Sequence, residues 1–202
     1  KGGIVTENVK VNAREAIEDY YVEKGYLDVK VRVLEVEDSI RTNSVRLVFD
    51  VDRGDRVKIK DIIISGNENV KAKKLRKQFE NTKEKRRLFS SSKFIKSDYE
   101  ADKELMINYY NTLGFRDARI LSDSLWRDDK GFLKIKINLV EGNRYYFRDI
   151  KWKGNSIYDE ETLSQVLSIE KGDVYNQELL QTRLSFSQDG RDVSTLYMDN
   201  GY

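Results

Sequence analysis

An internal repeat with a period of 88 residues constrains this chain more than any other feature. Gly142 repeats Gly54, and residues 150–155 (IKWKGN) repeat residues 62–67 (IIISGN), in each case 88 positions further on. Two apolar helix positions keep the same spacing: Leu75 with Leu163, and Phe79 with Leu167. A repeat of this length is a whole small domain rather than one turn of a solenoid. The chain therefore contains one complete unit and parts of two others.

A second repeated pattern marks where a helix of each unit ends. The pattern is tyrosine, three residues, glycine and an aromatic residue, and it occurs at 21–26, 110–115 and 197–202. Glycine just past a helix adopts the left-handed conformation without a Cβ penalty, and this stop brings the residues on its two sides into contact. We therefore expect an aromatic pair at each stop: Tyr21 with Tyr26, Tyr110 with Phe115, and Tyr197 with Tyr202.

The complete unit spans residues 56–143 and has the order β-α-α-β-β. Its apolar patterns predict strands at 56–65, 118–127 and 132–140, and helices at about 70–80 and 97–114. The apolar phase of the first strand shifts at Asp61, which suggests a β-bulge. Ser97 and Glu100 form a capping box that predicts the start of the second helix.

The two partial units flank this complete one. Residues 1–55 are predicted to be the C-terminal part of a unit, with a helix capped by Thr6 or Asn12 and a hairpin of residues 28–37 and 44–52. Residues 144–202 are predicted to be the N-terminal part of another, with its second helix from about Gln177. Because that part lacks two strands, we expect its sheet to be disordered or completed by another chain or by the first unit.

Composition excludes several kinds of chemistry. The chain has no Cys and no His, so it has no thiolate nucleophile, no zinc–thiolate site and no histidine general base. Charged residues make up 36% of the chain yet leave a net charge of +2, which argues against a generic nucleic-acid binder. No segment reaches the run of about 18 apolar residues typical of a membrane-spanning helix. We expect no enzymatic activity, no cofactor, no metal and no nucleic-acid partner.

These residues resemble the POTRA domains of the Omp85 superfamily. The resemblance is carried by the β-α-α-β-β order, the strand-ending Gly66-Asn67 and Gly154-Asn155, the glycine helix stops and the strand-ending Glu141-Gly142. Residues 196–202 resemble in particular the members that assemble outer-membrane β-barrels. The resemblance implies an α+β fold of tandem units, each with a three-stranded mixed sheet covered by two helices.

The resemblance also implies a function at the periplasmic face of the outer membrane of a Gram-negative bacterium. The chain would be part of an arm that precedes a membrane β-barrel. It would bind unfolded outer-membrane β-barrel precursors and accessory lipoproteins as a scaffold with no catalytic residues. Two alternatives remain open: the arm of a dedicated secretion or translocation transporter, and a spacer that binds anions or a membrane surface.

The predicted sheet has an edge strand that could receive a client. An edge strand can pair with another extended chain through main-chain hydrogen bonds, with little dependence on the client's sequence. By resemblance the acceptor is the second strand of the complete unit, with these residues: Ala118, Arg119, Ile120, Leu121, Ser122 and Asp123. The competing interpretation is an edge that its own charges protect.

A basic segment at residues 71–93 is the strongest charge feature. As a surface for an anionic partner we select Lys73, Lys74, Lys77, Arg86 and Arg87. The competing and favoured interpretation is a solvated helix followed by a mobile loop. The acidic clusters at 128–129 and 159–161 are interpreted as a turn and a first helical turn rather than as metal or acid–base sites.

Overall fold

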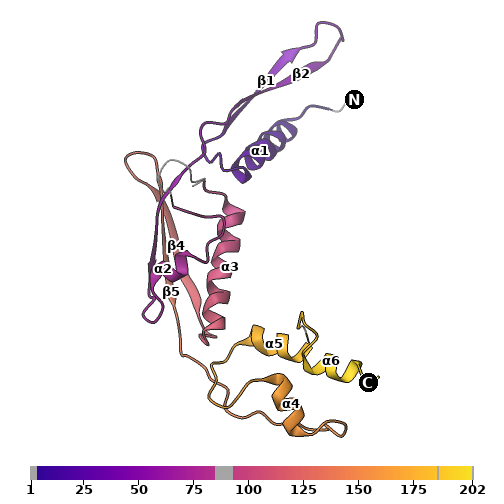
Figure 1. Ribbon diagram of the computed structural model, residues 1–202. Coiled ribbons are helices and arrows are strands. Elements are labelled where there is room, and N and C mark those ends of the chain that lie inside the picture. Colours follow the sequence, from indigo (N-terminus) through magenta and orange to yellow (C-terminus); the bar gives the residue numbers. More distant parts are fainter. Residues whose placement is uncertain (1–3, 85–92, 186, 202) are drawn as a thin grey trace. The chain divides into compact units, whose positions relative to one another are not determined.

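The computed structural model describes residues 4–84, 93–185 and 187–201 (Figure 1). The chain divides into two compact units. One unit comprises Lys1–Ile63, Phe79–Lys103 and Ser124–Lys136, and the other comprises Ile64–Gln78, Glu104–Asp123 and Ile137–Tyr202.

The N-terminal segment consists of one helix and one hairpin. Helix α1 spans Glu7–Glu23, and the Thr6 hydroxyl accepts a hydrogen bond from the Val9 amide, which makes Thr6 the N-cap. Strands β1, Lys30–Glu37, and β2, Val45–Asp52, pair in antiparallel register. Of the apolar residues expected to face inward on β2, Leu47, Phe49 and Val51 are half-buried and alternate with exposed residues, whereas Val45 is exposed.

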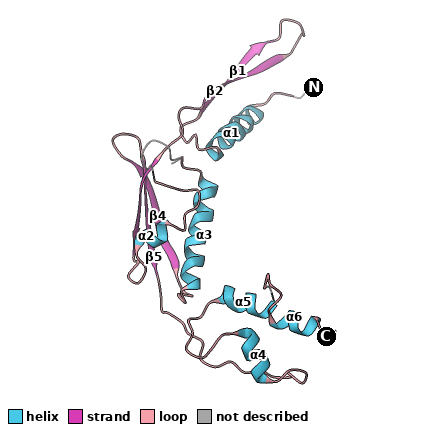
Figure 2. Ribbon diagram, viewed as in Figure 1, coloured by secondary structure: helices cyan, strands magenta, loops and turns pink. Residues whose placement is uncertain are grey.

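The centre of the fold is a three-stranded mixed sheet (Figure 2). Its strands are β3, Ile59–Ser65, β4, Arg119–Arg127, and β5, Leu133–Val140, in the order β3-β5-β4. The central strand β5 buries every second side chain, as expected for a strand with a neighbour on each side. On β3 the buried residues are Ile59, Ile62 and Ile64, which confirms the phase shift predicted at Asp61.

Two helices accompany this sheet: α2, Ala72–Arg76, and α3, Lys96–Thr112. Helix α3 runs alongside β4 and β5 (Figure 1) and buries Tyr99, Met106 and Tyr110. The fold is therefore α+β, with the predicted β-α-α-β-β order.

Helix α2 is shorter than the predicted helix over 70–80. The carboxylate of Asp102, fully buried on α3, accepts hydrogen bonds from the backbone amides of Glu80, Asn81 and Thr82. These amides therefore bind a side chain rather than helical carbonyls, and the helix ends at Arg76. Phe79 is nevertheless buried, as its apolar position predicts.

The capping box predicted at Ser97 is wrong, because Ser97 does not precede the helix. Helix α3 begins at Lys96, so Ser97 lies inside its first turn. The chain is held just before this point, because the Phe94 amide donates to the Val57 carbonyl and the Phe94 ring packs 5.6 Å from that of Tyr99, centroid to centroid.

The C-terminal segment consists of α4, Glu160–Leu167, α5, Gln177–Ser185, and α6, Val193–Met198. Leu163, Leu167, Ile169 and Val193 form its buried core. Residues 147–153, which repeat β3 at 88 positions further on, do not form a strand: among the described residues of this stretch there is a single bridge, between Tyr146 and Val174. A paired strand needs neighbours on the sheet, and the described residues of this segment provide only that bridge.

The glycine stops have the predicted geometry in two of the three copies. Gly25 and Gly114 both have φ of +88°. The Tyr26 amide donates to the Tyr21 carbonyl and the Phe115 amide to the Tyr110 carbonyl, each at 3.0 Å. The ring centroids of these pairs lie 6.0 Å and 5.8 Å apart. The third pair includes Tyr202, which lies outside the described residues.

The strand-to-helix turn also repeats. The side-chain amide of Asn67 donates to the Val70 carbonyl at 2.8 Å, and that of Asn155 donates to the Tyr158 carbonyl at 3.1 Å. Each asparagine thus closes its own turn, which is a structural role.

Candidate functional site

Strand β4 lies at one edge of the three-stranded sheet. It is last in the strand order, with β5 as its sheet neighbour among the described residues. A tight turn joins the two strands: the Asp128 amide donates to the Phe132 carbonyl at 2.9 Å. The other side of β4 is therefore the side on which an additional strand could pair.

The predicted client residues lie at the start of this strand. Ala118 is buried just before β4 and Ile120 is half-buried, so these two anchor the strand to the core. Arg119, Leu121 and Ser122 are exposed, and Asp123 is half-buried. The sequence thus selects a segment that presents its backbone edge while its inward side chains hold it in place.

The exposed side chains of β4 are unusually apolar for an edge strand. Leu121 is 61% exposed, and Leu125 and Trp126 are exposed by 41% and 40%. Natural edge strands are commonly protected by charges. On β4 the charges are Arg119 and Arg127 at its ends and Asp123 between them. Arg127 is engaged, because its guanidinium makes a bidentate pair with Asp28 at 2.7 and 2.8 Å.

The opposite edge of the sheet, β3, is partly covered by the chain itself. The Ile62 amide donates to the Glu84 carboxylate at 3.0 Å. Just before β3, the Val57 carbonyl accepts from the Phe94 amide at 2.9 Å. Glu84 and Phe94 thereby use main-chain positions that a client strand would need, so β4 is the more accessible edge.

A buried carboxylate at the end of β5 ties the strand to the turn before α2. Glu141 is 4% exposed and accepts hydrogen bonds from the Asn69 amide at 2.8 Å, the Asn69 side chain at 2.6 Å, the Val70 amide at 3.1 Å and the Tyr110 hydroxyl at 2.8 Å. Burial raises the pKa of Glu141, but these hydrogen bonds outweigh it and hold that pKa below its ordinary value. Burial, with the hydrogen bond to Glu141, raises the pKa of Tyr110.

Sequence reasoning treated Glu141 only as part of a strand-ending motif. Its role was missed because its partners lie 31 to 72 positions away in the chain. The available signal was its position, a carboxylate directly before Gly142, a glycine with φ of +70°.

Only part of the basic segment at residues 71–93 lies within the described residues. Lys73, Lys74 and Lys77 lie exposed on or just after α2. Arg86 and Arg87 lie outside the described residues, so the structure brings together three members of the selected set.

The acidic clusters have the structural roles that the sequence predicts. Asp159 is the N-cap of α4 and accepts from the Thr162 amide at 2.8 Å. Asp128 bonds Lys60 at 2.7 Å, and this contact lowers the pKa of Asp128. Across residues 4–84, 93–185 and 187–201, no group of three acidic side chains is placed to hold a metal ion. The helices within these ranges are all too short or too polar to span a membrane.

Comparison with known families decides the classification. The POTRA family model, described as "Surface antigen variable number repeat", matches residues 57–142 and again residues 145–202. The chain belongs to the POTRA family. The two matches begin 88 positions apart, which is the period of the sequence repeat.

Similar proteins are named as assembly factors. The outer membrane protein assembly factor BamA of Neisseria meningitidis serogroup B is 26% identical over 178 residues, which cover 86% of this chain and 22% of that protein. BamA of Buchnera aphidicola is 22% identical over 81% of this chain and 27% of that protein. This POTRA chain therefore spans about a quarter of the length of these relatives. A crystal structure of Haemophilus influenzae BamA POTRA3-5 is also similar, with a TM-score of 0.47 and 19% identity. The match covers 100% of this chain and 73% of the crystallised chain.

Proposed function

We propose that this POTRA chain is part of the periplasmic arm of an outer-membrane β-barrel assembly factor, where it binds unfolded barrel precursors by adding their strands to β4. The observation that carries the proposal is an accessible edge strand that presents exposed apolar side chains, Leu121 above all. Such an edge favours pairing with another extended chain.

The chemistry of strand addition suits a receptor for many different clients. Main-chain hydrogen bonds supply the affinity and are the same for every client, while alternate side chains of the added strand contact the neighbouring surface. Barrel precursors are rich in segments of alternating polarity. The apolar side chains of such a segment would contact the exposed apolar side chains of β4. No catalytic residue is needed, so we propose a scaffold rather than an enzyme.

The arrangement of units extends this proposal. We assign residues 1–55 to the end of one POTRA domain, 56–143 to a complete domain and 144–202 to the start of the next. In the full-length protein a membrane β-barrel would follow the arm, and accessory lipoproteins would dock on it. The names of the relatives support an assembly arm over the arm of a dedicated secretion transporter.

The test is a titration of the ¹⁵N-labelled chain with a peptide of alternating apolar and polar residues. We expect amide shifts concentrated at residues 119–127. Leu121→Lys should weaken peptide binding about fivefold, because it removes an apolar contact and adds a protective charge to the edge. Ile63→Lys is the matched control, since Ile63 is 41% exposed on the opposite edge strand β3.

Two results would count against strand addition at β4. One is a titration in which shifts appear elsewhere while residues 119–127 stay unchanged. The other is equal weakening by Leu121→Lys and Ile63→Lys, which would indicate nonspecific apolar binding.

A further inference from the structure

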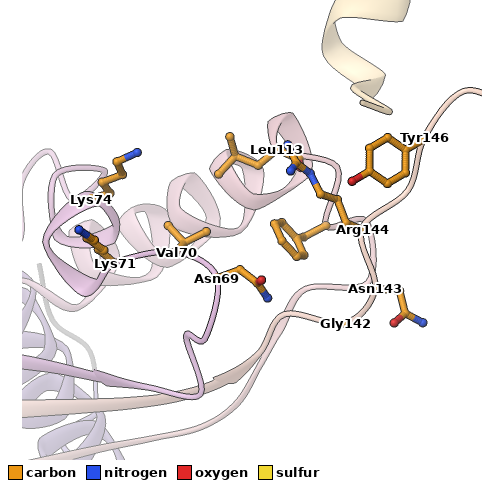
Figure 3. Close-up of a pocket in the computed structure, with 10 residues that line it drawn as sticks. Asn69, Val70, Lys71, Lys74, Leu113, Gly142, Asn143, Arg144 and Tyr146 are labelled. Carbon is orange, nitrogen blue, oxygen red and sulfur yellow. The ribbon is translucent and has the colours of Figure 1, made fainter. Parts of the chain in front are cut away.

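A basic cavity lies beside the turn that leads into α2. Its volume is about 710 Å³, and its basic residues are Lys71, Lys74 and Arg144. Lys71 and Lys74 are exposed at α2, whereas Arg144 follows the strand-ending Gly142. Figure 3 shows the two lysines at one end of the cavity and Arg144 with Tyr146 at the other, with Val70 and Leu113 between them.

None of the residues that line this basic cavity is acidic. The nearby Glu141 carboxylate binds Asn69 and Val70 and is buried, so it does not line the cavity. Three like charges without a lining counter-charge create a positive potential that favours an anionic ligand.

Arg144 is held in place before any ligand arrives. Its Nε donates to the Leu113 carbonyl at 2.9 Å, and its guanidinium carbon lies 6.0 Å from the Phe115 ring centroid and 5.7 Å from that of Tyr146. Within the described part of the chain its two terminal nitrogens have no hydrogen-bond partner. A guanidinium fixed in this way can bind a carboxylate with little further loss of side-chain entropy.

The first joint between repeats offers a natural comparison. A cavity of about 630 Å³ there includes Arg56, which precedes Arg144 by 88 positions and stacks on Tyr26 at 5.0 Å. That cavity is lined by two carboxylates, Asp28 and Asp55, together with five basic side chains: Arg53, Arg56, Lys58, Arg127 and Lys130. The position equivalent to Asp55 in the basic cavity is Asn143, which is neutral. The first cavity therefore holds carboxylates beside its cations, whereas the lining of the basic cavity has none.

We propose that the basic cavity binds an acidic polypeptide segment, with one carboxylate at Lys71 and Lys74, another at Arg144, and an apolar side chain between them against Val70 and Leu113. The size of the cavity and the placement of its cations at two ends favour a ligand with two separated anionic groups over a single small oxyanion. The apolar residues between the ends favour a peptide, which carries both kinds of side chain.

The test measures binding of fluorescent peptides to the 202-residue chain by anisotropy. Each peptide carries two glutamates separated by one to four residues that include leucine, and a control series carries glutamine instead. We expect the glutamate peptides to bind, with one preferred spacing and with affinity that falls as salt rises.

Matched variants separate the cavity from the general charge of α2. Lys71→Gln with Lys74→Gln should weaken binding about tenfold, whereas Lys73→Gln with Lys77→Gln, which removes the same charge from residues that do not line the cavity, should change it less than about twofold. Asn143→Asp should weaken binding about fivefold, because it introduces the carboxylate that the first joint has.

Three results would overturn the proposal. Equal weakening by the two lysine pairs would indicate attraction by net charge alone. Full displacement of the peptide by an equal concentration of inorganic phosphate would indicate a simple oxyanion site. Binding to anionic phospholipid vesicles that depends on Lys71 and Lys74, without binding of the glutamate peptides, would indicate a membrane surface as the partner.

Discussion

Replacement of Glu141 by glutamine should destabilise the fold strongly, although the two side chains have almost the same volume. Each carboxylate oxygen accepts two hydrogen bonds: Oε1 from the Val70 amide and the Tyr110 hydroxyl, and Oε2 from the two nitrogens of Asn69. In Glu141→Gln one of these oxygens becomes an NH₂ group, so at least one backbone amide, that of Val70 or that of Asn69, would face a donor in a buried site.

The magnitude follows from the hydrogen bonds that are lost. A hydrogen bond to a charged group contributes roughly 1.5–3 kcal/mol, and an unsatisfied buried donor costs about 1–3 kcal/mol. We therefore expect Glu141→Gln to lower the free energy of unfolding by about 2–4 kcal/mol. Tyr110→Phe removes one donor and keeps the ring, so about 1–2 kcal/mol is expected. Urea unfolding followed by circular dichroism at neutral pH measures both.

The pH dependence gives a second, independent check on Glu141. Its pKa in the folded state is lowered, so the stability it contributes is present above the unfolded-state pKa and is lost as pH falls through the folded-state pKa. The difference between the native chain and Glu141→Gln should therefore shrink as the pH falls below about 4.3, the ordinary value for glutamate. A difference under about 0.5 kcal/mol at neutral pH, within the range of an ordinary surface substitution, would refute this reasoning, as would a difference that grows in acid.

Three further substitutions test other parts of the structure. Gly114→Ala should cost about 2–4 kcal/mol by urea unfolding, because φ is +88° and a Cβ there would lie 2.9 Å from a backbone oxygen. The control Gly131→Ala, where φ is +77° and nothing lies within 4 Å, should cost only about 1–2 kcal/mol, and equal costs would contradict the close approach at Gly114. Asp102→Asn should cost about 2–3 kcal/mol, since it replaces a carboxylate that binds three backbone amides, and a neutral result would contradict that role. Arg127→Ala should cost less than about 1 kcal/mol and even less in high salt, because its pair with Asp28 is exposed; a large, salt-independent loss would contradict a surface ion pair.

The repeat and its glycine stops could be predicted because their signals are local. A helix stop depends on one residue with positive φ and on aromatic residues within five positions of each other, and Gly114 carries both signals in the sequence. The hairpin that makes β4 an edge strand is also local, because a short turn at Asp128 joins it to β5. Local signals of this kind therefore indicated the fold, whereas the choice of β4 as the acceptor strand came from the family resemblance.

The early end of α2 could not be predicted, because it depends on a distant side chain. The apolar spacing of Leu75 and Phe79 is that of a longer helix, and both residues are indeed buried. The hydrogen bonds that end the helix come from Asp102, about 20 residues further along the chain. Tertiary contacts of this kind commonly override the propensity of a short helix.

The basic cavity was also beyond sequence reasoning. Lys74 was selected as part of a basic segment. Its position across a cavity from Arg144 requires the strand-ending Gly142 to lie near α2. The one sequence clue is the exchange of Asp55 for Asn143 between repeats, and it becomes meaningful only when Asn143 is seen to line the basic cavity.

Hydrogen exchange of the β4 amides tests the central claim most directly. The exchange rates of residues 119–127 would be measured with and without a saturating peptide derived from an outer-membrane β-barrel strand. Strand addition should slow the outward-facing amides, which are every second residue of β4, and leave Ile59–Ser65 on the opposite edge unchanged. Unchanged rates along β4 with the peptide bound, or slowing at β3 instead, would contradict the assignment of β4 as the client strand.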